Sequence, residues 1–292
     1  MPRGETKPIT LLIKAAIRIL TKEWPMTIRQ LFYRIVSTKG KSGQALMVNS
    51  TASYKKVSRI MTKARRDGRC DYDFIVDRSR ADYTAGGWNN PTQFLRYVSK
   101  DYHRDYWTMQ PKYVEIWTEK DAVIGSIESL CQELGVSIYP CKGFNSTTKV
   151  HECAERLQCI DKPIEIFYAG DWDSSGTGKN GIEEDAKRRV LEQGAPPFTM
   201  TRLAIFPEDI KKYDLPFFKA KESDSRTPGF RVQYSNKCIE LDALPPNELR
   251  RRIRNAVEAV MDMESWARAV AVEEVEKKSI LDFIARFPKK AA

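Results

Sequence analysis

Residues 163–176 read PIEIFYAGDWDSSG, and this stretch decides how the rest of the chain is interpreted. Its first half is an apolar run of strand length, typical of a strand buried on both faces of a parallel sheet. Three further runs of this kind lie at 113–118, 136–141 and 199–206. Helical segments separate the runs, at about 121–134, 147–159 and 180–193. Strands and helices that alternate at this spacing predict an α/β protein with a mostly parallel sheet.

Three acidic residues follow the predicted strands. Glu119 comes after the run at 113–118, and Asp171 and Asp173 come after the run at 163–169. Ligands of open α/β sheets collect at the carboxyl ends of the strands, and residues two apart on an extended segment point to the same side. Carboxylate oxygens suit Mg²⁺, so these residues predict a metal site for phosphodiester chemistry. The alternative is that Asp-x-Asp-Ser-Ser-Gly forms only a turn, and the residues alone favour neither interpretation.

The first 80 residues carry all of the chain's net positive charge. They hold 18 Lys and Arg against six Asp and Glu, whereas the whole chain of 292 residues has a net charge of +10. Helices are predicted at 8–20, at 28–37 after an N-cap at Thr27, and from Ser50 or Thr51 to Arg66, with a short strand at 70–76. Three helices and a strand predict a winged helix-turn-helix domain, whose third helix lies in a DNA groove. The alternative is a basic surface that only aids solubility.

The predicted helix at 28–37 carries one tyrosine outside its apolar stripe. Ile28, Leu31, Phe32, Ile35 and Val36 follow helical spacing and form the buried face, whereas Tyr33 lies well away from it, beside Arg29. We therefore expect the Tyr33 hydroxyl to face solvent or a ligand. A guanidinium favours tyrosinate, so covalent attack on a DNA phosphate is chemically feasible. The alternative is an exposed tyrosine that merely packs or contacts phosphate.

The order of these segments resembles the A subunit of type IIB DNA topoisomerases (topoisomerase VI), the related meiotic double-strand-break transesterases and, most closely, the short stand-alone Mini-A proteins of prokaryotes. Five segments carry the resemblance, which covers most of the chain: TIRQLFYRIV at 27–36, WTEKDAVIGSI at 117–127, KGFNSTTKVHECAERL at 142–157, GDWDSSG at 170–176 and KCIELDAL at 237–244. Ser174 and Asn145 stand where the family pattern usually has proline. The last segment places Lys237 and Glu240 at motif positions.

The resemblance implies a fold, a reaction and partners. It implies a winged-helix domain with the catalytic tyrosine over residues 1–80, a connector over 81–111, and a Toprim domain, a Rossmann-like parallel sheet, over 112–292 that includes C-terminal helices. It implies a homodimer on double-stranded DNA, in which Tyr33 forms a 5′-phosphotyrosyl link, Arg29 steadies the phosphate, and Glu119, Asp171 and Asp173 hold Mg²⁺. One protomer's tyrosine then works with the other's metal site. The expected contacts to the DNA backbone are Arg34, Lys55, Lys56, Arg59, Lys63, Arg66, Lys142 and Lys149.

Other features narrow the function. The run at 176–181 lacks the spacing of a phosphate loop, and no ATPase region is recognisable, so strand passage is expected to need a separate ATPase subunit or no ATP. No apolar run approaches the roughly 20 residues that span a bilayer, and the N-terminus lacks a signal-peptide pattern. We expect a cytoplasmic, nucleoid-associated protein of prokaryotic or mobile-element origin. Two other functions remain open: a Toprim nuclease that uses water and Mg²⁺, and a non-catalytic DNA-binding regulator.

Overall fold

The structure is a computed structural model that describes residues 7–40, 43–76, 86–141, 146–177, 181–220, 222, 224, 226–234 and 236–286. The N-terminal part contains α1 (Lys7–Glu23), α2 (Ile28–Ser37) and α3 (Thr51–Arg66), which confirms the three predicted helices. α2 begins with a capping box, in which the Thr27 side chain accepts from the Gln30 backbone N–H and the Gln30 side chain accepts from the Thr27 backbone N–H. Ser50 caps α3 in a similar way.

The strand predicted at 70–76 is wrong. A short 3₁₀ helix, η1 (Tyr72–Phe74), takes its place because the Asp71 side chain accepts a hydrogen bond from the Asp73 backbone N–H and turns the chain. Within residues 7–40 and 43–76 the strand-like pairings are isolated bridges, one between Met26 and Ile75 and one near residue 40. The described part of this unit is therefore a three-helix arrangement, and no wing of paired strands is seen within it.

A parallel sheet forms the centre of the rest of the chain. Its strands are β1 (Tyr113–Thr118), β2 (Ser137–Pro140), β3 (Ile164–Ala169) and β4 (Thr199–Ala204), in the order β2-β1-β3-β4 and parallel throughout. The predicted helices between them are confirmed as α5 (Asp121–Glu133), α6 (Thr147–Gln158) and α7 (Ile182–Glu192). The mixed α/β architecture predicted from residues 163–176 is therefore confirmed.

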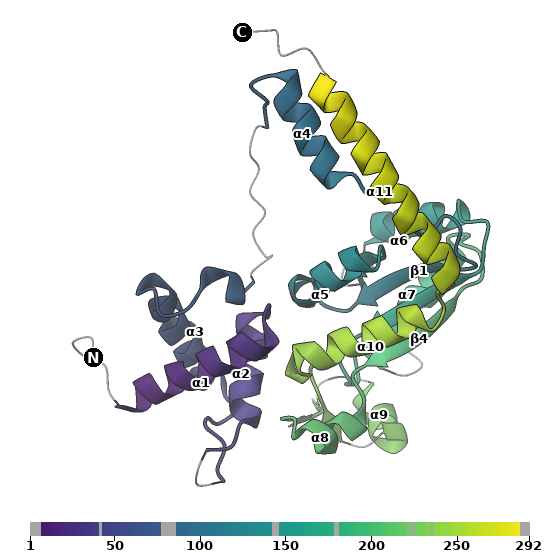
Figure 1. Cartoon of the computed structure of the whole chain (residues 1–292). Coiled ribbons are helices and arrows are strands. Elements are labelled where there is room, and N and C mark those ends of the chain that lie inside the picture. Colours follow the sequence, from purple (N-terminus) through teal and green to yellow (C-terminus); the bar gives the residue numbers. More distant parts are fainter. Residues whose placement is uncertain are drawn as a thin grey trace.

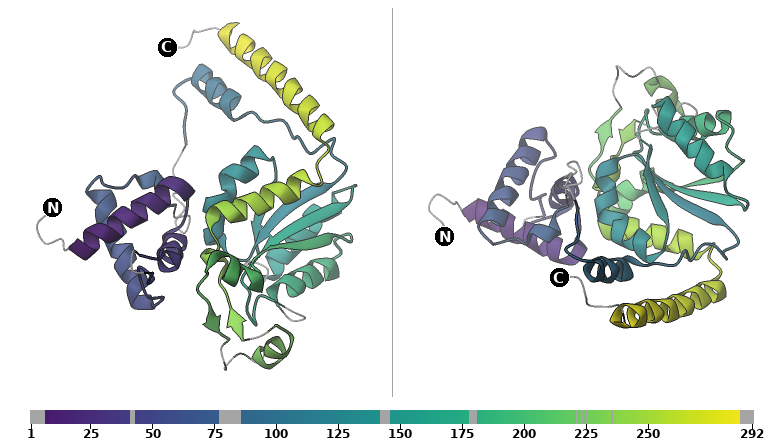
Figure 2. Two further views of the ribbon diagram at one scale, coloured as in Figure 1. Left: turned by 60° about the horizontal axis from the view of Figure 1, so that its bottom comes forward. Right: turned by 90° about the horizontal axis from the view of Figure 1, so that it is seen from above.

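Helices cover both faces of this sheet (Figures 1 and 2). α5 and α10 (Pro246–Glu258) pack on one face, where Ile116 belongs to the larger hydrophobic core. α6 and α7 pack on the other face, around a second core that contains Trp117 and Ile166. Neighbouring residues of β1 thus point into different cores, as a strand buried on both faces requires.

The remaining elements lie around this layered unit. They are α8 (Pro207–Tyr213), β5 (Phe218–Lys219), α9 (Thr227–Tyr234), β6 (Lys237–Cys238) and the 3₁₀ helix η3 (Leu241–Ala243). α4 (Pro91–Asp101) packs beside the long α11 (Met263–Arg286), and the pair stands away from the sheet (Figure 1). Within the described residues, no helix has both the length and the apolar composition that a bilayer crossing requires.

Candidate functional site

Tyr33 lies at the contact between α2 and the segment that contains η3. Its side chain is only 8% exposed, so the expectation that its hydroxyl faces solvent is wrong. The ring packs against Phe32, with 5.4 Å between ring centroids, and the Arg29 guanidinium lies 5.9 Å from its centroid. The face of α2 that points away from its own domain's core is covered by residues around Glu240, about 200 positions along the chain. Helical periodicity within α2 carries no information about that contact.

Arg29 is held by a carboxylate of this same chain. Its Nη2 atom lies 2.6 Å from Glu240 Oε1 and 2.5 Å from Oε2, and its Nε atom lies 4.0 Å from Asp242 Oδ2. In addition to burial, Glu240 raises the pKa of Tyr33 and Arg29 lowers it, since both groups lie beside the phenol. The pKa of Arg29 is raised, because Glu240 and Tyr33 together outweigh the effect of burial. The arginine expected to steady a phosphate therefore binds the Glu240 carboxylate in this structure.

The predicted acidic residues come together because β1 and β3 are adjacent parallel strands. Glu119 follows β1, and its Oε2 accepts a hydrogen bond of 2.8 Å from the backbone N–H of Asp171, just beyond β3. Gly176 brings the following turn close to Glu119, since a Cβ there would lie 3.1 Å from Glu119 Oε2 and 2.7 Å from the Asp171 carbonyl oxygen. The sequence thus located two neighbouring carboxylates from strand ends alone.

Asp173 has a different role from the one the metal hypothesis gives it. Its Oδ1 accepts hydrogen bonds from the Ser175 backbone N–H at 2.8 Å, the Ser175 hydroxyl at 2.7 Å and the Gly176 backbone N–H at 2.7 Å. These bonds build the turn of residues 173–176. The turn that was the alternative interpretation of Asp-x-Asp-Ser-Ser-Gly is therefore present.

Lys120 links the carboxylate of Asp171, beside Glu119, with the two carboxylates beside Arg29. Its ammonium lies 2.8 Å from Asp171 Oδ2, 3.3 Å from Asp242 Oδ2 and 3.4 Å from Glu240 Oε2. Asp242 is 1% exposed, and its Oδ1 has no hydrogen-bond partner among the described residues. Neither Lys120 nor Asp242 is among the site residues expected from the sequence. The signal for Lys120 in the sequence was its position directly after Glu119 at the end of a strand. Asp242 had no such signal, because only the fold brings it next to Lys120.

The pKa values reflect crowding of like charges at low exposure. Burial, followed by repulsion from Asp171, raises the pKa of Glu119 to about 7. Burial also raises the pKa of Asp171 and of Asp242, although Lys120 opposes both shifts. Burial and the Glu240 charge raise the pKa of Tyr33 to about 12, against the opposing effect of Arg29. In this arrangement Tyr33 is held as the neutral phenol at physiological pH.

The acids do not fit a magnesium ion as they lie. Both oxygens of Asp171 are used, Oδ2 by Lys120 and Oδ1 by the Leu241 backbone N–H at 2.7 Å, while Oδ1 of Asp173 is used by its turn. Within the described ranges, no three His, Cys, Asp or Glu side chains are placed to hold a metal ion. The site shown is an ion-pair network in which Lys120 supplies the positive charge.

The expected DNA contacts fall into three groups. One group is exposed on α3 without a carboxylate partner in the described part of the chain: Lys55, Lys56, Arg59, Lys63 and Arg66. The second group is paired, Arg34 with both oxygens of Glu23 at 2.9 Å and Lys149 with Glu152 at 2.6 Å. Lys142 lies outside the described residues. The α3 surface is therefore the predicted contact that is free to meet a polyanion.

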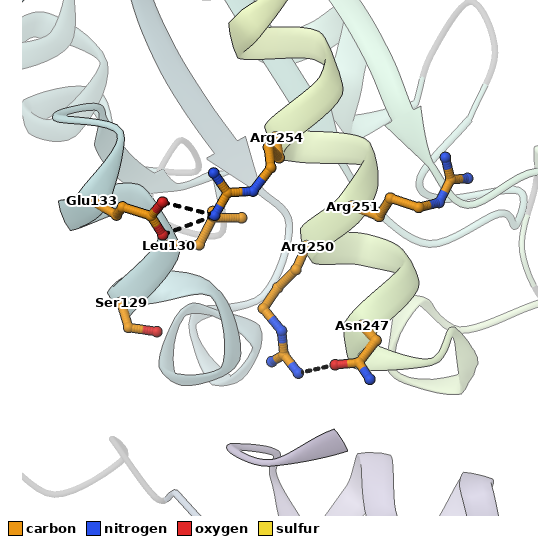
Figure 3. Close-up of a pocket in the computed structure, with 7 residues that line it drawn as sticks. All are labelled: Ser129, Leu130, Glu133, Asn247, Arg250, Arg251 and Arg254. Carbon is orange, nitrogen blue, oxygen red and sulfur yellow. Dashed lines mark hydrogen bonds and ion pairs between the residues drawn. The ribbon is translucent and has the colours of Figure 1, made fainter. Parts of the chain in front are cut away.

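Arg250 on α10 joins the N-terminal helices to the sheet. Its guanidinium donates to the backbone oxygens of Glu23, Pro25 and Ser126 at 2.8, 3.2 and 2.7 Å. Beside it, α5 and α10 enclose a pocket of about 430 Å³, lined by Ser129, Leu130, Glu133, Asn247, Arg250, Arg251 and Arg254 (Figure 3). Arg254 pairs with both oxygens of Glu133 there. A second tie connects Gln30 of α2 with Ser126 of α5 at 3.2 Å.

No family model matches this chain, and neither does any curated protein or solved structure.

Proposed function

We propose that this protein is a DNA-cleaving and rejoining transesterase that resembles the type IIB topoisomerase A subunit, with a winged-helix domain, a Toprim domain and Tyr33 as nucleophile. One observation carries the proposal. Segments around residues 29–33, 119–120, 171–173 and 240–242, which resemble family motifs and are far apart in sequence, meet in one network of contacts. A tyrosine and a turn with unrelated roles would not be expected to contact the same ion-pair network.

The proposed step is an exchange of phosphate esters. The Tyr33 phenol gives its proton to water and its oxygen attacks a backbone phosphorus, which forms a tyrosine–phosphate bond and breaks the bond to the 3′ oxygen. That oxygen takes a proton from water and leaves as a hydroxyl, so one ester replaces another and rejoining is the reverse step. Arg29 lies against the Tyr33 ring and bears a guanidinium suited to two phosphate oxygens. It would favour tyrosinate and stabilise the charge of the transition state.

DNA binding is proposed at the basic face of α3. Five exposed cations on one helix of 16 residues favour a polyanion held through its backbone, with little sequence selectivity. Cleavage of both strands needs two tyrosines, so the proposal includes a homodimer. An ATPase subunit for strand passage also belongs to the proposal. So does a Mg²⁺ requirement, which demands that Asp171 first be released from Lys120.

Trapping a covalent adduct tests the proposal. Supercoiled plasmid is incubated with the protein, with and without Mg²⁺ and ATP, and the reaction is stopped with detergent. We expect DNA that carries bound protein, and we expect Tyr33→Phe to abolish it. Tyr72→Phe is the matched control, because it removes a hydroxyl from an exposed tyrosine of the same N-terminal unit.

The other outcomes separate the alternatives. Cleavage that survives in Tyr33→Phe without any adduct would indicate a nuclease that uses water. Binding without cleavage, unchanged by Glu119→Gln or Asp171→Asn, would indicate a regulator. Either result contradicts the transesterase.

A further inference from the structure

Groups from two separate parts of the chain converge on a single carboxylate. The Glu240 oxygens receive the Arg29 guanidinium at 2.5–2.6 Å and the Lys120 ammonium at 3.4 Å, and the Tyr33 ring lies beside Arg29, 5.9 Å from the guanidinium. Arg29 and Tyr33 belong to the N-terminal helices, whereas Lys120 and Glu240 belong to the sheet unit. Two cations and a phenol around one anion make a site of the kind that binds a phosphate group.

The Glu240 carboxylate and a DNA phosphodiester are chemically alike in the features this site recognises. Each carries one negative charge on two equivalent oxygens, and each accepts paired N–H donors of an arginine. We propose that the Glu240 carboxylate occupies the position of a DNA phosphate next to Tyr33, so that this structure is self-blocked and DNA must displace Glu240 from Arg29. This inference rests on the proposed function, because it names the group that competes with the substrate at that site.

Hydrogen bonds hold the backbone on both sides of Glu240, whereas its side chain can rotate away from Arg29. Ile239 and Trp172 exchange two backbone hydrogen bonds of 2.9 Å, and the Leu241 backbone N–H binds Asp171. The Glu240 side chain is 20% exposed, whereas that of Asp242 is 1% exposed. Of the two acids beside Arg29, Glu240 is thus the one that reaches solvent by side-chain rotation, without any change in the sheet.

The charge of the network also opposes an incoming phosphate while Glu240 is in place. Arg29 and Lys120 are the cations, and Glu119, Asp171, Glu240 and Asp242 are the acids around them. A phosphate that enters therefore meets an excess of carboxylates and an arginine whose donors are already used. Removing the Glu240 charge frees the Arg29 fork and lowers the repulsion at the same time.

The test measures DNA binding and does not need turnover. A fluorescein-labelled duplex of about 20 base pairs is titrated with wild-type protein, Glu240→Gln and Glu133→Gln, and binding is followed by fluorescence anisotropy at several salt concentrations. Glu133→Gln removes the same charge from an exposed pair with Arg254, outside the network. We expect Glu240→Gln to bind about fivefold to tenfold more tightly than the control, as one freed charged contact allows. Its salt slope is expected to be steeper by about 0.9, the value for one additional phosphate contact.

The possible outcomes distinguish a failure of this inference from a failure of the proposed function. Equal affinities of Glu240→Gln, Glu133→Gln and the wild type, with DNA bound by all three, would overturn this inference and leave the proposed function standing. DNA bound by none of them would overturn both. Glu240→Ala keeps the backbone pairing of Ile239 with Trp172, so it must tighten binding in the same direction even if glutamine perturbs folding. Tightening that persists when Arg29→Gln is added would also contradict the inference, because Arg29 is the group that Glu240 is said to block.

Discussion

Replacing Glu119 by glutamine is predicted to stabilise the protein above neutral pH and to leave its stability unchanged near pH 4. Burial, followed by repulsion from Asp171, raises the pKa of Glu119 from an ordinary value of 4.5 to about 7 in the folded protein. Between these values the folded protein holds a proton that the unfolded chain has released. The stability contributed by this proton is fully present below pH 4.5 and is lost as the pH rises through 7.

The expected magnitude follows from the size of this pKa change. One pH unit corresponds to about 1.4 kcal/mol, so a change from 4.5 to about 7 sets an upper limit of about 3 kcal/mol. Glu119 is partly exposed, and solvent screening reduces the expectation to about 1–2 kcal/mol. Glutamine keeps an oxygen for the Asp171 backbone N–H, which donates to Glu119 at 2.8 Å, and it carries no charge at any pH.

Urea unfolding at pH 4.5, 6 and 8.5, with EDTA present, measures the difference. The free energy of unfolding of Glu119→Gln should exceed that of the wild type increasingly as the pH rises. Glu264→Gln serves as the control, because this glutamate is 82% exposed and far from the network, and its difference should not change with pH. A Glu119→Gln difference that is the same at pH 4.5 and pH 8.5, or a variant less stable than the wild type at pH 8.5, would show that the Glu119 charge does not destabilise the folded protein.

Three further predictions follow from the same contacts. Lys120→Met removes the ammonium that is paired with Asp171. We therefore expect 10 mM Mg²⁺ to raise the melting temperature of the variant by a few degrees more than that of the wild type, corresponding to about 1 kcal/mol. Equal shifts in melting temperature would contradict this. Replacing Lys56 and Arg59 by glutamine should weaken DNA binding and lower the salt slope by about 0.9 per lost contact, whereas Arg188→Gln on α7 should leave the slope unchanged. Light scattering should give about twice the chain mass of 33.6 kDa, and a mass of one chain would contradict the dimer.

Local signals in the sequence were sufficient for much of the fold. The Thr27 cap and the apolar spacing after it fixed both ends of α2, and the strand-length runs located β1 to β4 within about two residues. Glu119 and Asp171 were placed together correctly because strand ends of a parallel sheet meet at one edge. These features depend on residues near one another in sequence or on a general rule of topology.

The environment of Tyr33 was not predictable in this way. Its burial depends on Glu240, and the pairing of Arg34 with Glu23 depends on how α1 packs against α2. The strand expected at 70–76 does not form, because the Asp71 side chain accepts a hydrogen bond from the Asp73 backbone N–H and turns the chain. Contacts between distant segments, and single side chains that compete for backbone groups, are outside what periodicity records.

The covalent link is tested by identifying the residue that carries the DNA. After trapping, digestion with nuclease and trypsin should release the peptide of residues 30–34, QLFYR, because cleavage follows Arg29 and Arg34. Tyr33 is the sole hydroxyl or carboxyl side chain in this peptide, so a nucleotide mass on it assigns the link without ambiguity. We expect a phosphotyrosyl-linked nucleotide on this peptide. A nucleotide found on another peptide, or cleaved DNA with no peptide attached, would contradict it.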